Sequence, residues 1–501
     1  MAEPFAYDAV AYRTHALPTA HPDNFYVIGS LYGLSPAPAE RCRYLEVGCG
    51  TGTHLIAAAL ALPAARFVGV DLSAAAVERG WQVVRDLGLP NVELVHADLL
   101  AWNPGPEPFD YIAAHGVYSW VPAPVRDRLL ALCQEKLAPD GLAYISYNAL
   151  PGSHFRRVIW DMLKLHTRGT ADPGEQIAEA RGCLQFLHDG LSTSGDVWAA
   201  AIRSDVEKAI DPEDSYLLYH DDLSPTNDPM YLTDFVAHAG RYGLGYVADS
   251  QPQTQSTAGF PPAIARQLAA MQKQDPLLRE QYLDFLKLRR FHRTILCRAD
   301  RAPLAVPSAE AIPDLHVSTM ASRVTESVDL SPGTAMAFGT PTGRKVTVDQ
   351  PLPKAVLTTL CDRSPERIPF SELVEAVAGR LGGSAQVNAW ELANMVLDGY
   401  SNGFCDLHGH RPAIAFTPGE RPAASPLARR EAATGNHVTT LLHTTLRLDD
   451  EPSRRLVQLM DGTRDRAALA AGLAGLVPAD QVAAGVENSL AWLAKAGLLM
   501  G

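Results

Sequence analysis

The stretch CRYLEVGCGTG at residues 42–52 decides the fold, because an apolar strand runs here directly into a turn that contains three glycines. Small residues are needed where a backbone turns sharply and approaches a ligand closely. Residues 52–61 then read as a helix. A strand, a glycine-rich turn and a helix in this order predict a nucleotide-type ligand at the carboxyl end of a parallel strand.

Strand-like and helix-like runs alternate along residues 42–148. The strand-like runs lie at 42–48, 65–70, 91–97, 109–115 and 141–148, with helical stretches near 52–61, 73–88 and 122–137. Two further strand-like runs, 243–250 and 293–299, follow a mainly helical region. We therefore expect a doubly wound α/β fold, with a mostly parallel seven-stranded sheet and helical insertions, followed by smaller α+β domains.

Two segments rich in proline and alanine, at 300–314 and 416–427, suggest three domains. Residues 1–300 form the predicted catalytic domain, with a helical insertion over about 151–228. Residues 301–425 predict a middle domain, in which a hairpin (AMAFG and RKVTV) precedes three helices and the short strands FCDL and AIAF, an order that resembles a winged helix. Residues 428–501 predict a small helical or winged-helix-like domain.

The composition is typical of a globular protein and argues against a nucleic-acid partner. The formal net charge of −13 suits a basic protein or peptide better than a phosphate backbone. The N-terminus lacks the regions of a signal peptide, and no run of about 18 apolar residues predicts membrane insertion. The seven scattered cysteines include no Cys-x-x-Cys pair, so we expect reduced thiols, a cytoplasmic location and no metal site.

Three carboxylates decide what the glycine turn binds. Glu46 lies two positions before Gly48, where it would repel a pyrophosphate and attract the ammonium group of a methionine moiety. Asp71 ends the second strand, where its carboxylate can accept both ribose hydroxyls, and Asp98 ends the third, within reach of an adenine amino group. The turn alone is also compatible with dinucleotide binding. Asp71 and Asp98 taken alone could instead cap the helices that follow them. Together the three carboxylates favour S-adenosylmethionine, with S-adenosylhomocysteine as product.

The predicted cofactor-binding set extends to neighbours of these residues. It consists of Glu46, Gly48, Cys49, Gly50, Gly52, Asp71, Leu72, Asp98, Leu99 and His115.

The acceptor should meet the methyl group at the ends of strands four and five. These ends supply the predicted catalytic residues Tyr118, Trp120, His115, Tyr147 and Asn148. The fourth strand lacks the (Asn/Asp)-Pro-Pro-(Tyr/Phe) motif, which argues against adenine or glutamine-amide methylation. Aromatic walls suit a lysine amine, since they favour the developing methylammonium. Alternatively, Tyr118 and Trp120 only pack the strand end, and His115 acts either as a base or as a hydrogen-bond partner of the backbone.

The N-terminal leader carries Tyr7, Tyr12, His15, His21 and Pro22. We expect it either to fold over the cofactor as a lid or to pack as an arm.

Several longer stretches resemble one family. VGVDLS and HADLL match the ribose- and adenine-binding strands of class I S-adenosylmethionine methyltransferases. YDAVAYRTHALPTAHP, HGVYSWVP, AYISYNALPGSHFR and HDDLSPTNDPMYLTDFVAHAGRYGLGYVAD, with MDGTRDRAALA near the C-terminus, are similar to bacterial methyltransferases that carry a methyltransferase regulatory domain. This group includes the rickettsial protein lysine methyltransferases, which modify outer-membrane protein.

The resemblance implies lysine ε-amine methylation and a homodimer. It implies a regulatory segment over about 215–300, an insertion that serves dimerisation or as a lid, and middle and C-terminal domains that hold a large substrate. It assigns Glu46, Gly48, Gly50, Asp71 and Asp98 to the cofactor, and places Tyr118, Trp120 and Tyr147 near the acceptor.

Other functions stay open at this point. A DNA-binding winged helix is disfavoured, because the segment VNAWELANMVLDG at 387–399 contains Glu391 and Asp398 but no lysine or arginine. The alternatives to a protein-lysine methyltransferase are a methyltransferase of a small-molecule amine or hydroxyl, and a non-catalytic adaptor that binds the cofactor.

Overall fold

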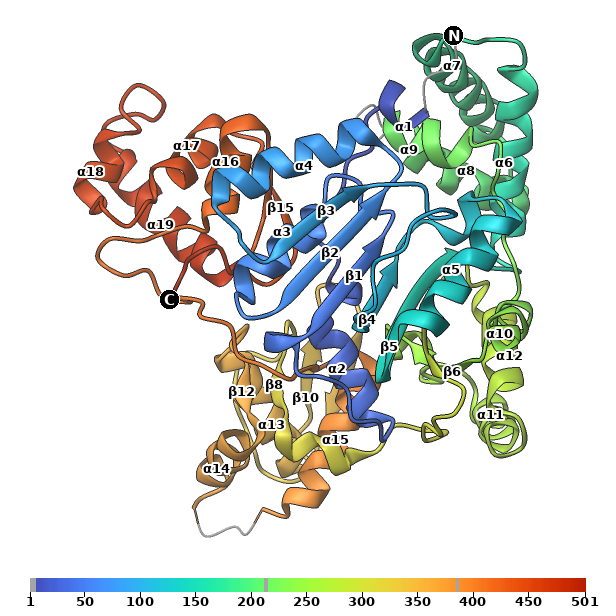
Figure 1. Cartoon of the computed structure of the whole chain (residues 1–501). Helices are drawn as coiled ribbons and strands as arrows, with labels where there is room; N and C mark the ends of the chain where they lie inside the picture. The colour runs from blue at the N-terminus through green and yellow to red at the C-terminus, as the bar shows by residue number, and fades with distance from the viewer. Residues whose placement is uncertain (1–5, 211–214, 384–386) are drawn as a thin grey trace.

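The computed structural model describes residues 6–210, 215–383 and 387–501 (Figure 1). A seven-stranded sheet lies at its centre, in the order β3-β2-β1-β4-β5-β7-β6. The strands are β1 (Arg43–Val47), β2 (Arg66–Asp71), β3 (Val92–His96), β4 (Phe109–Ala114), β5 (Leu137–Asn148), β6 (Leu244–Asp249) and β7 (Phe291–Arg298). Only β7 runs antiparallel to its neighbours, so the predicted mostly parallel sheet is confirmed.

Helices cover both faces of the sheet, which explains why its strands read as nearly continuous apolar runs. The helices α2 (Pro22–Leu31), α3 (Thr53–Ala61) and α4 (Ala74–Leu87) share one core with Tyr44 of β1. The helices α5 (Ala123–Lys136) and α10 (Leu232–Arg241) share the opposite core with Leu45 and Val47. The alternation along β1 thus sends side chains into two cores.

A helical insertion follows β5. It comprises α6 (Ser153–His166), α7 (Pro173–Ser192), α8 (Val197–Ala209), α9 (Ser215–Leu217) and the π-turn η5 (Leu218–Asp222). Ile159, Leu163, Leu184 and Val206 form a small core of its own. The helices α11 (Pro262–Gln274) and α12 (Pro276–Lys287) then lead into β7. In Figure 1 these helices line one side of the sheet.

The middle part of the chain contains small sheets and three longer helices. Its elements are η7 (Ala309–Asp314), β8 (His316–Ser318), β9 (Ser322–Arg323), β10 (Met336–Gly339), β11 (Lys345–Val348), α13 (Pro351–Asp362), β12 (Ile368–Pro369), α14 (Phe370–Arg380), α15 (Ala389–Asn402) and β13 (Asp406–His408). The strands β10 and β11 pair as the predicted hairpin. Ile312 and the apolar faces of these helices belong to the same core as α2, so this part packs directly against the central seven-stranded sheet.

Two expectations for this region are wrong. The stretch AIAF forms no strand, because Ile414 makes only a single bridge, to Met500 near the C-terminus. FCDL contributes β13, which pairs with β8. The expected 300–314 linker is partly structured, since Ala309 and Ile312 of η7 are buried.

The C-terminal part is a compact unit beside α3 and α4, drawn in red in Figure 1. It contains α16 (Pro426–Thr434), β14 (His437–Thr439), β15 (Thr445–Arg447), α17 (Glu451–Leu459), α18 (Arg466–Ala471) and α19 (Val482–Lys495), which enclose a separate core. An ion pair of 2.9 Å between Arg430 and Asp86 ties it to α4. Within the described ranges, no helix is both long and apolar enough to span a membrane.

Candidate active site

The turn after β1 needs its glycines. Gly48, Gly50 and Gly52 have φ angles of 74°, 55° and 69°, in the left-handed region that favours glycine. A Cβ atom at Gly48 would lie 2.5 Å from Val117 Cγ2, and one at Gly50 would lie 2.6 Å from Thr14 Cγ2. The turn is therefore shaped both by its backbone and by the segments packed on it.

A cavity of about 370 Å³ lies beside this turn, at the carboxyl ends of the strands. Seven of the predicted site residues line it: Glu46, Gly48, Cys49, Gly50, Asp71, His115 and Trp120. Gly52 stands just behind, as the residue before α3. The structure thus brings together the strand-one and strand-two part of the predicted site.

Glu46 presents a buried carboxyl group to this cavity. Its side chain is buried, and its Oε2 atom has no hydrogen-bond partner among the described residues. Burial, and secondarily the nearby Asp71, raise the pKa of Glu46 well above its usual range. A buried carboxylate with a free oxygen fits a cationic group such as the ammonium of S-adenosylmethionine.

Asp71 is held in place by the backbone. Its Oδ2 accepts a hydrogen bond of 2.7 Å from the Gly50 amide, and its Oδ1 one of 2.8 Å from the Ser73 amide. Burial raises the pKa of Asp71, and these two hydrogen bonds oppose that rise. Each oxygen keeps further lone pairs, so the carboxylate can still accept from ribose hydroxyls.

The residues predicted to contact adenine lie outside the cavity. Asp98 is exposed, and its Oδ1 accepts from the Leu100 amide at 2.9 Å in a turn between β3 and β4, where no helix begins. Leu99 is buried in the core with α5, and Leu72 is 48% exposed. None of the three lines the cavity, so their contact with a cofactor remains a prediction.

His115 lines the cavity as a neutral ring. Its Nδ1 lies 2.8 Å from the Tyr144 hydroxyl, and its ring stacks on that of Tyr144. Burial, followed by the charge of Arg293, lowers the pKa of His115 to about 3. An imidazole with so low a pKa is a weak base, so a positioning role fits it better than proton abstraction.

Trp120 is the predicted acceptor-side residue that reaches the cavity. It ends the 3-10 turn η3 (Tyr118–Trp120), and its buried Nε1 has no hydrogen-bond partner among the described residues. An unpaired indole N–H in a cavity invites an acceptor group from a ligand.

Tyr118, Tyr147 and Asn148 lie outside the cavity. Tyr147 stacks on Phe235 at 4.3 Å and shares a hydrogen bond of 3.2 Å with Thr294, while the Tyr118 hydroxyl pairs with His238. Asn148 Nδ2 donates to Asn227 at 2.8 Å. These contacts hold β5 and η3 against the later segments. The packing alternative therefore describes the contacts of Tyr118, and the acceptor roles of Tyr147 and Asn148 stay predictions.

Sequence reasoning missed His54, Ser73, Ala76, Arg79 and Gly116 of the cavity wall, and three further parts that come from distant segments. These parts are Arg13, Thr14 and Leu17 of the N-terminal arm, Tyr216, Leu217 and Asp221 around α9 and η5, and Phe291 at the start of β7. Thr14 Oγ1 lies 2.7 Å from Thr53 Oγ1, which fixes the arm across the glycine turn. The quoted stretch HDDLSPTNDP contains Asp221, but only the fold brings it to the strand ends.

Part of the N-terminal leader contributes to the cavity wall. Tyr12 and His15 line the cavity, whereas His21 and Pro22 lie at the start of α2. The side chain of Tyr7 lies outside what the structure describes.

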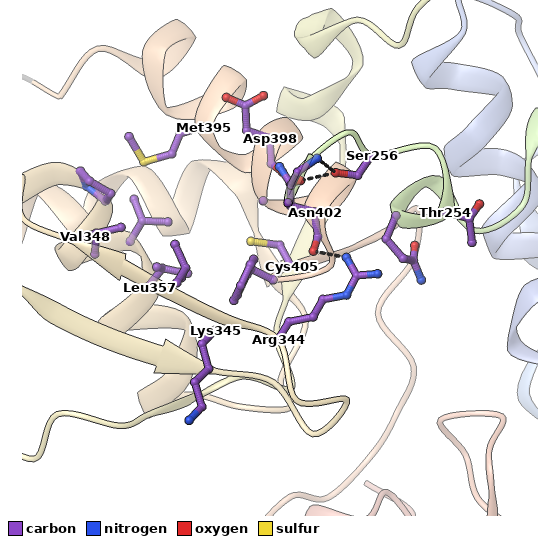
Figure 2. A pocket seen from close by; sticks show the side chains of 18 of the residues that line it. Thr254, Ser256, Arg344, Lys345, Val348, Leu357, Met395, Asp398, Asn402 and Cys405 are labelled. Atoms are coloured by element: carbon purple, nitrogen blue, oxygen red, sulfur yellow. Dashed lines mark hydrogen bonds between the residues drawn. The ribbon is translucent and has the colours of Figure 1, made fainter. Parts of the chain in front are cut away.

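A larger cavity, of about 870 Å³, lies elsewhere, between the loop after β6 and the middle part of the chain (Figure 2). Arg344 donates there to the Asn402 carbonyl at 2.8 Å, and Ser256 to the Asn402 side chain at 2.6 Å. None of the glycine-turn or strand-end residues lines it, so its size does not make it the cofactor site.

The sheet order with one antiparallel strand, the glycine turn after β1 and the carboxylates of β1 and β2 define a class of protein: this is a class I S-adenosylmethionine-dependent methyltransferase. In the part of the chain that the structure describes, no three histidine, cysteine, aspartate or glutamate side chains could hold a metal ion.

Comparison with known proteins places the chain in a family. Family models match a methyltransferase domain at 45–141, a predicted methyltransferase regulatory domain at 214–298 and the C-terminal winged helix domain of PKMT at 420–491. The Rickettsia prowazekii protein RP789 is 30% identical over 94% of this chain and 86% of its own length. RP028 of the same organism is 33% identical over 47% of this chain and 93% of its own. The chain therefore belongs to the family of rickettsial-type class I methyltransferases with a regulatory domain.

The fold agrees with a solved structure. PKMT2 from Rickettsia typhi, determined in complex with AdoHcy, superposes with a TM-score of 0.85 at 24% identity. The match covers 98% of this chain and 100% of that one, so all parts of the fold are shared.

Proposed function

We propose that this chain transfers the methyl group of S-adenosylmethionine to the ε-amine of lysine in a protein substrate. The observation that carries the proposal is the composition of the cavity, in which buried carboxylates and aromatic side chains converge at the strand ends. Relatives bearing the PKMT name support a protein acceptor. An outer-membrane or other bacterial protein is the expected kind of target.

In this proposal Glu46 binds the methionine ammonium group, and Asp71 binds the ribose hydroxyls. The Gly48–Gly52 turn, with Cys49, lets the cofactor approach the backbone closely. Asp98, Leu72 and Leu99 stand near the adenine, and His115 orients the groups between them. The cofactor supplies an electrophilic methyl group. The chain aligns the amine with the methyl group and excludes water. The rings of Trp120 and Phe291 stabilise the methylammonium as it forms.

The size of the chain supports a large substrate. The middle and C-terminal parts pack around the methyltransferase sheet, and Arg13 and His15 line both the cavity and a neighbouring cleft to the C-terminal unit. We propose that the domains keep the division expected from the sequence, 1–300, 301–425 and 428–501, and that the latter two help to hold the substrate.

A label-transfer experiment tests the acceptor. Bacterial lysate is incubated with the chain and methyl-tritiated S-adenosylmethionine, then separated into protein and small molecules. Label in protein that yields methyl-lysine on hydrolysis supports the proposal, whereas label only in small molecules contradicts it. Asp71→Ala is the matched control and should remove the transfer. A non-catalytic adaptor would show no transfer with either protein.

We propose that the helical insertion forms a homodimer. Phe186, Val197 and Trp198 of α7 and α8 are 76%, 72% and 61% exposed, which is unusual for large apolar side chains. Sedimentation equilibrium should give a dimer for the native chain and a monomer for Phe186→Glu combined with Trp198→Glu. A monomeric native chain at micromolar concentration would contradict the dimer.

A further inference from the structure

The π-turn η5 directs two adjacent carboxylates to opposite sides. Asp222 is buried and accepts hydrogen bonds of 2.7 Å from both Arg156 and Trp160. Asp221 lines the active-site cavity instead. Single π-turns of this kind often occur at functional sites, because they turn a side chain out of helical register. Here Asp222 anchors the turn and leaves Asp221 facing the cavity.

The Asp221 carboxylate is unpaired within the part of the chain that the structure describes. Among the described residues no hydrogen bond or ion pair reaches it, although the Asp221 carbonyl accepts from Asn227 at 3.2 Å. Burial, and next the charge of Asp222, raise the pKa of Asp221 to about 7 against the opposing effect of Arg156. Arg156 belongs to α6 and Asp222 to the same turn. The other charged or titratable side chains that line the cavity are those of Tyr12, Arg13, His15, Glu46, Cys49, His54, Asp71, Arg79, His115 and Tyr216.

The topology separates Trp120 and Phe291 from the cofactor turn. Along the sheet edge, β2 and β1 supply Asp71 and Glu46, and β7 lies three strands beyond β1. Phe291, the first residue of β7, pairs with Asn148 at the end of β5 and also lines the cavity. Trp120 follows β4, between these two ends. The cavity thus has a carboxylate-and-glycine end and an aromatic end.

We propose that Asp221, Trp120 and Phe291 form the subsite for a primary amine, in which Asp221 pairs with the ammonium group and takes its proton. This rests on the proposed function. The proton passes from the amine nitrogen to an Asp221 oxygen, which frees the nitrogen lone pair. That lone pair then forms the N–C bond to the methyl carbon, while the S–C bond breaks and its electrons remain on sulfur.

The chemistry of the subsite suits a lysine carried by a peptide. A lysine amine has an ordinary pKa near 10.4, so a carboxylate must first attract the ammonium form and then relieve it of a proton. The rings of Trp120 and Phe291 favour the methylammonium that forms. The unpaired Nε1 of Trp120 can donate to a peptide carbonyl beside the lysine, which a simple amine lacks.

A binding measurement tests the subsite without turnover. Sinefungin resembles the cofactor but has an amine-bearing carbon in place of the sulfonium and its methyl group, so its ammonium group should meet Asp221. By calorimetry we expect Asp221→Asn to weaken sinefungin at least tenfold while S-adenosylhomocysteine binding changes less than twofold. In the native chain the preference for sinefungin should also decline as the pH falls from 8 to 6, because Asp221 becomes protonated.

Asp228→Asn is the matched control, since this carboxylate of the same segment is 61% exposed and pairs with Arg126. It should leave both affinities unchanged. Equal losses for both ligands in Asp221→Asn, or no loss for sinefungin, would overturn the subsite even if methyl-lysine is formed. A selective loss of sinefungin together with label in small amines would support the subsite and contradict the lysine proposal.

Discussion

The Nε2 atom of His443 lies 2.7 Å from the Nδ1 atom of His54, and this contact joins the C-terminal unit to the helix after the glycine turn. His54 Nδ1 also accepts from the Leu17 amide at 3.2 Å, and His54 Nε2 lies 3.1 Å from the Tyr44 hydroxyl. Since Nδ1 accepts, His54 carries its proton on Nε2 and His443 donates from Nε2. Both rings are neutral in this network.

The histidine contact predicts loss of stability in mild acid. Burial lowers the pKa of His54 to about 4 and that of His443 well below its usual value of 6.5. The unfolded chain takes up these protons below pH 6.5 and the folded chain does not, so stability is full above 6.5 and falls as the pH drops towards 4. His54 contributes up to roughly 3 kcal/mol to this loss, and His443 adds to it in the same direction. Thermal unfolding between pH 8 and pH 4.5 measures it.

The variant His54→Gln combined with His443→Gln should flatten this dependence, whatever its stability at neutral pH. An unchanged slope of Tm against pH below 6.5 would show that other groups cause the loss.

Replacing Glu46 should separate binding from stability. In Glu46→Gln the buried unpaired charge disappears, so we expect the cofactor-free chain to be more stable by about 1 kcal/mol. Affinity for S-adenosylhomocysteine should fall roughly 10- to 100-fold, because the ammonium group loses its counter-charge. Calorimetry and thermal unfolding of the same preparation measure the two effects. A simultaneous loss of stability would argue for a structural role of Glu46.

The contact between Gly50 and Thr14 predicts a rescue. Gly50→Ala places a Cβ atom 2.6 Å from Thr14 Cγ2 in a residue whose φ is 55°, so both strain and a clash are expected. Gly88→Ala is the control, because Gly88 has a φ of 62° and nothing lies within 4 Å of the added atom. It should cost about 1 kcal/mol, and Gly50→Ala clearly more.

Adding Thr14→Ser to Gly50→Ala removes the clashing methyl group and keeps the hydroxyl that meets Thr53. The double variant should lose no more stability than the Gly88→Ala control does. It should also recover most of the cofactor affinity of the native chain. If it does not, the arm does not press on the glycine turn in the way the contact indicates.

The sheet could be predicted because its strands are buried on both faces. The run from Arg43 to Val47 and its parallel neighbours read as apolar segments between helices, and the observed strand ends differ from the expected ones by only a few residues. The strand predicted for AIAF is absent because a short apolar run does not determine which segment it packs against. Ile414 forms its bridge with Met500, which is distant in the sequence.

The site was predictable where it is local. Glu46, Gly48, Gly50 and Asp71 lie within one strand–turn–helix unit and the following strand, so sequence order fixes their meeting. The far wall depends on long-range pairing: Phe291 reaches the cavity through the antiparallel pairing of β7 with β5. The ring of Tyr147 packs on Phe235, because side chains alternate between the two faces of the sheet along β5.

The last prediction concerns a buried charge network behind the site. Arg289 lies 2.9 Å from both Asp249 and Asp284, and His292 bridges the same two carboxylates. Arg289→Met removes the positive charge that pairs with two buried carboxylates. The free energy of unfolding should therefore fall by about 3–5 kcal/mol. This loss of stability should be larger at pH 8 than at pH 5.5. In the variant the carboxylates take up protons as the pH falls, which removes their unpaired charge. Arg298→Met, which removes an ion pair to the 65% exposed Asp300, should change stability by less than about 1 kcal/mol. Urea unfolding at both pH values distinguishes these outcomes, and equal effects of the two variants would mean that the buried network contributes no more than a surface pair.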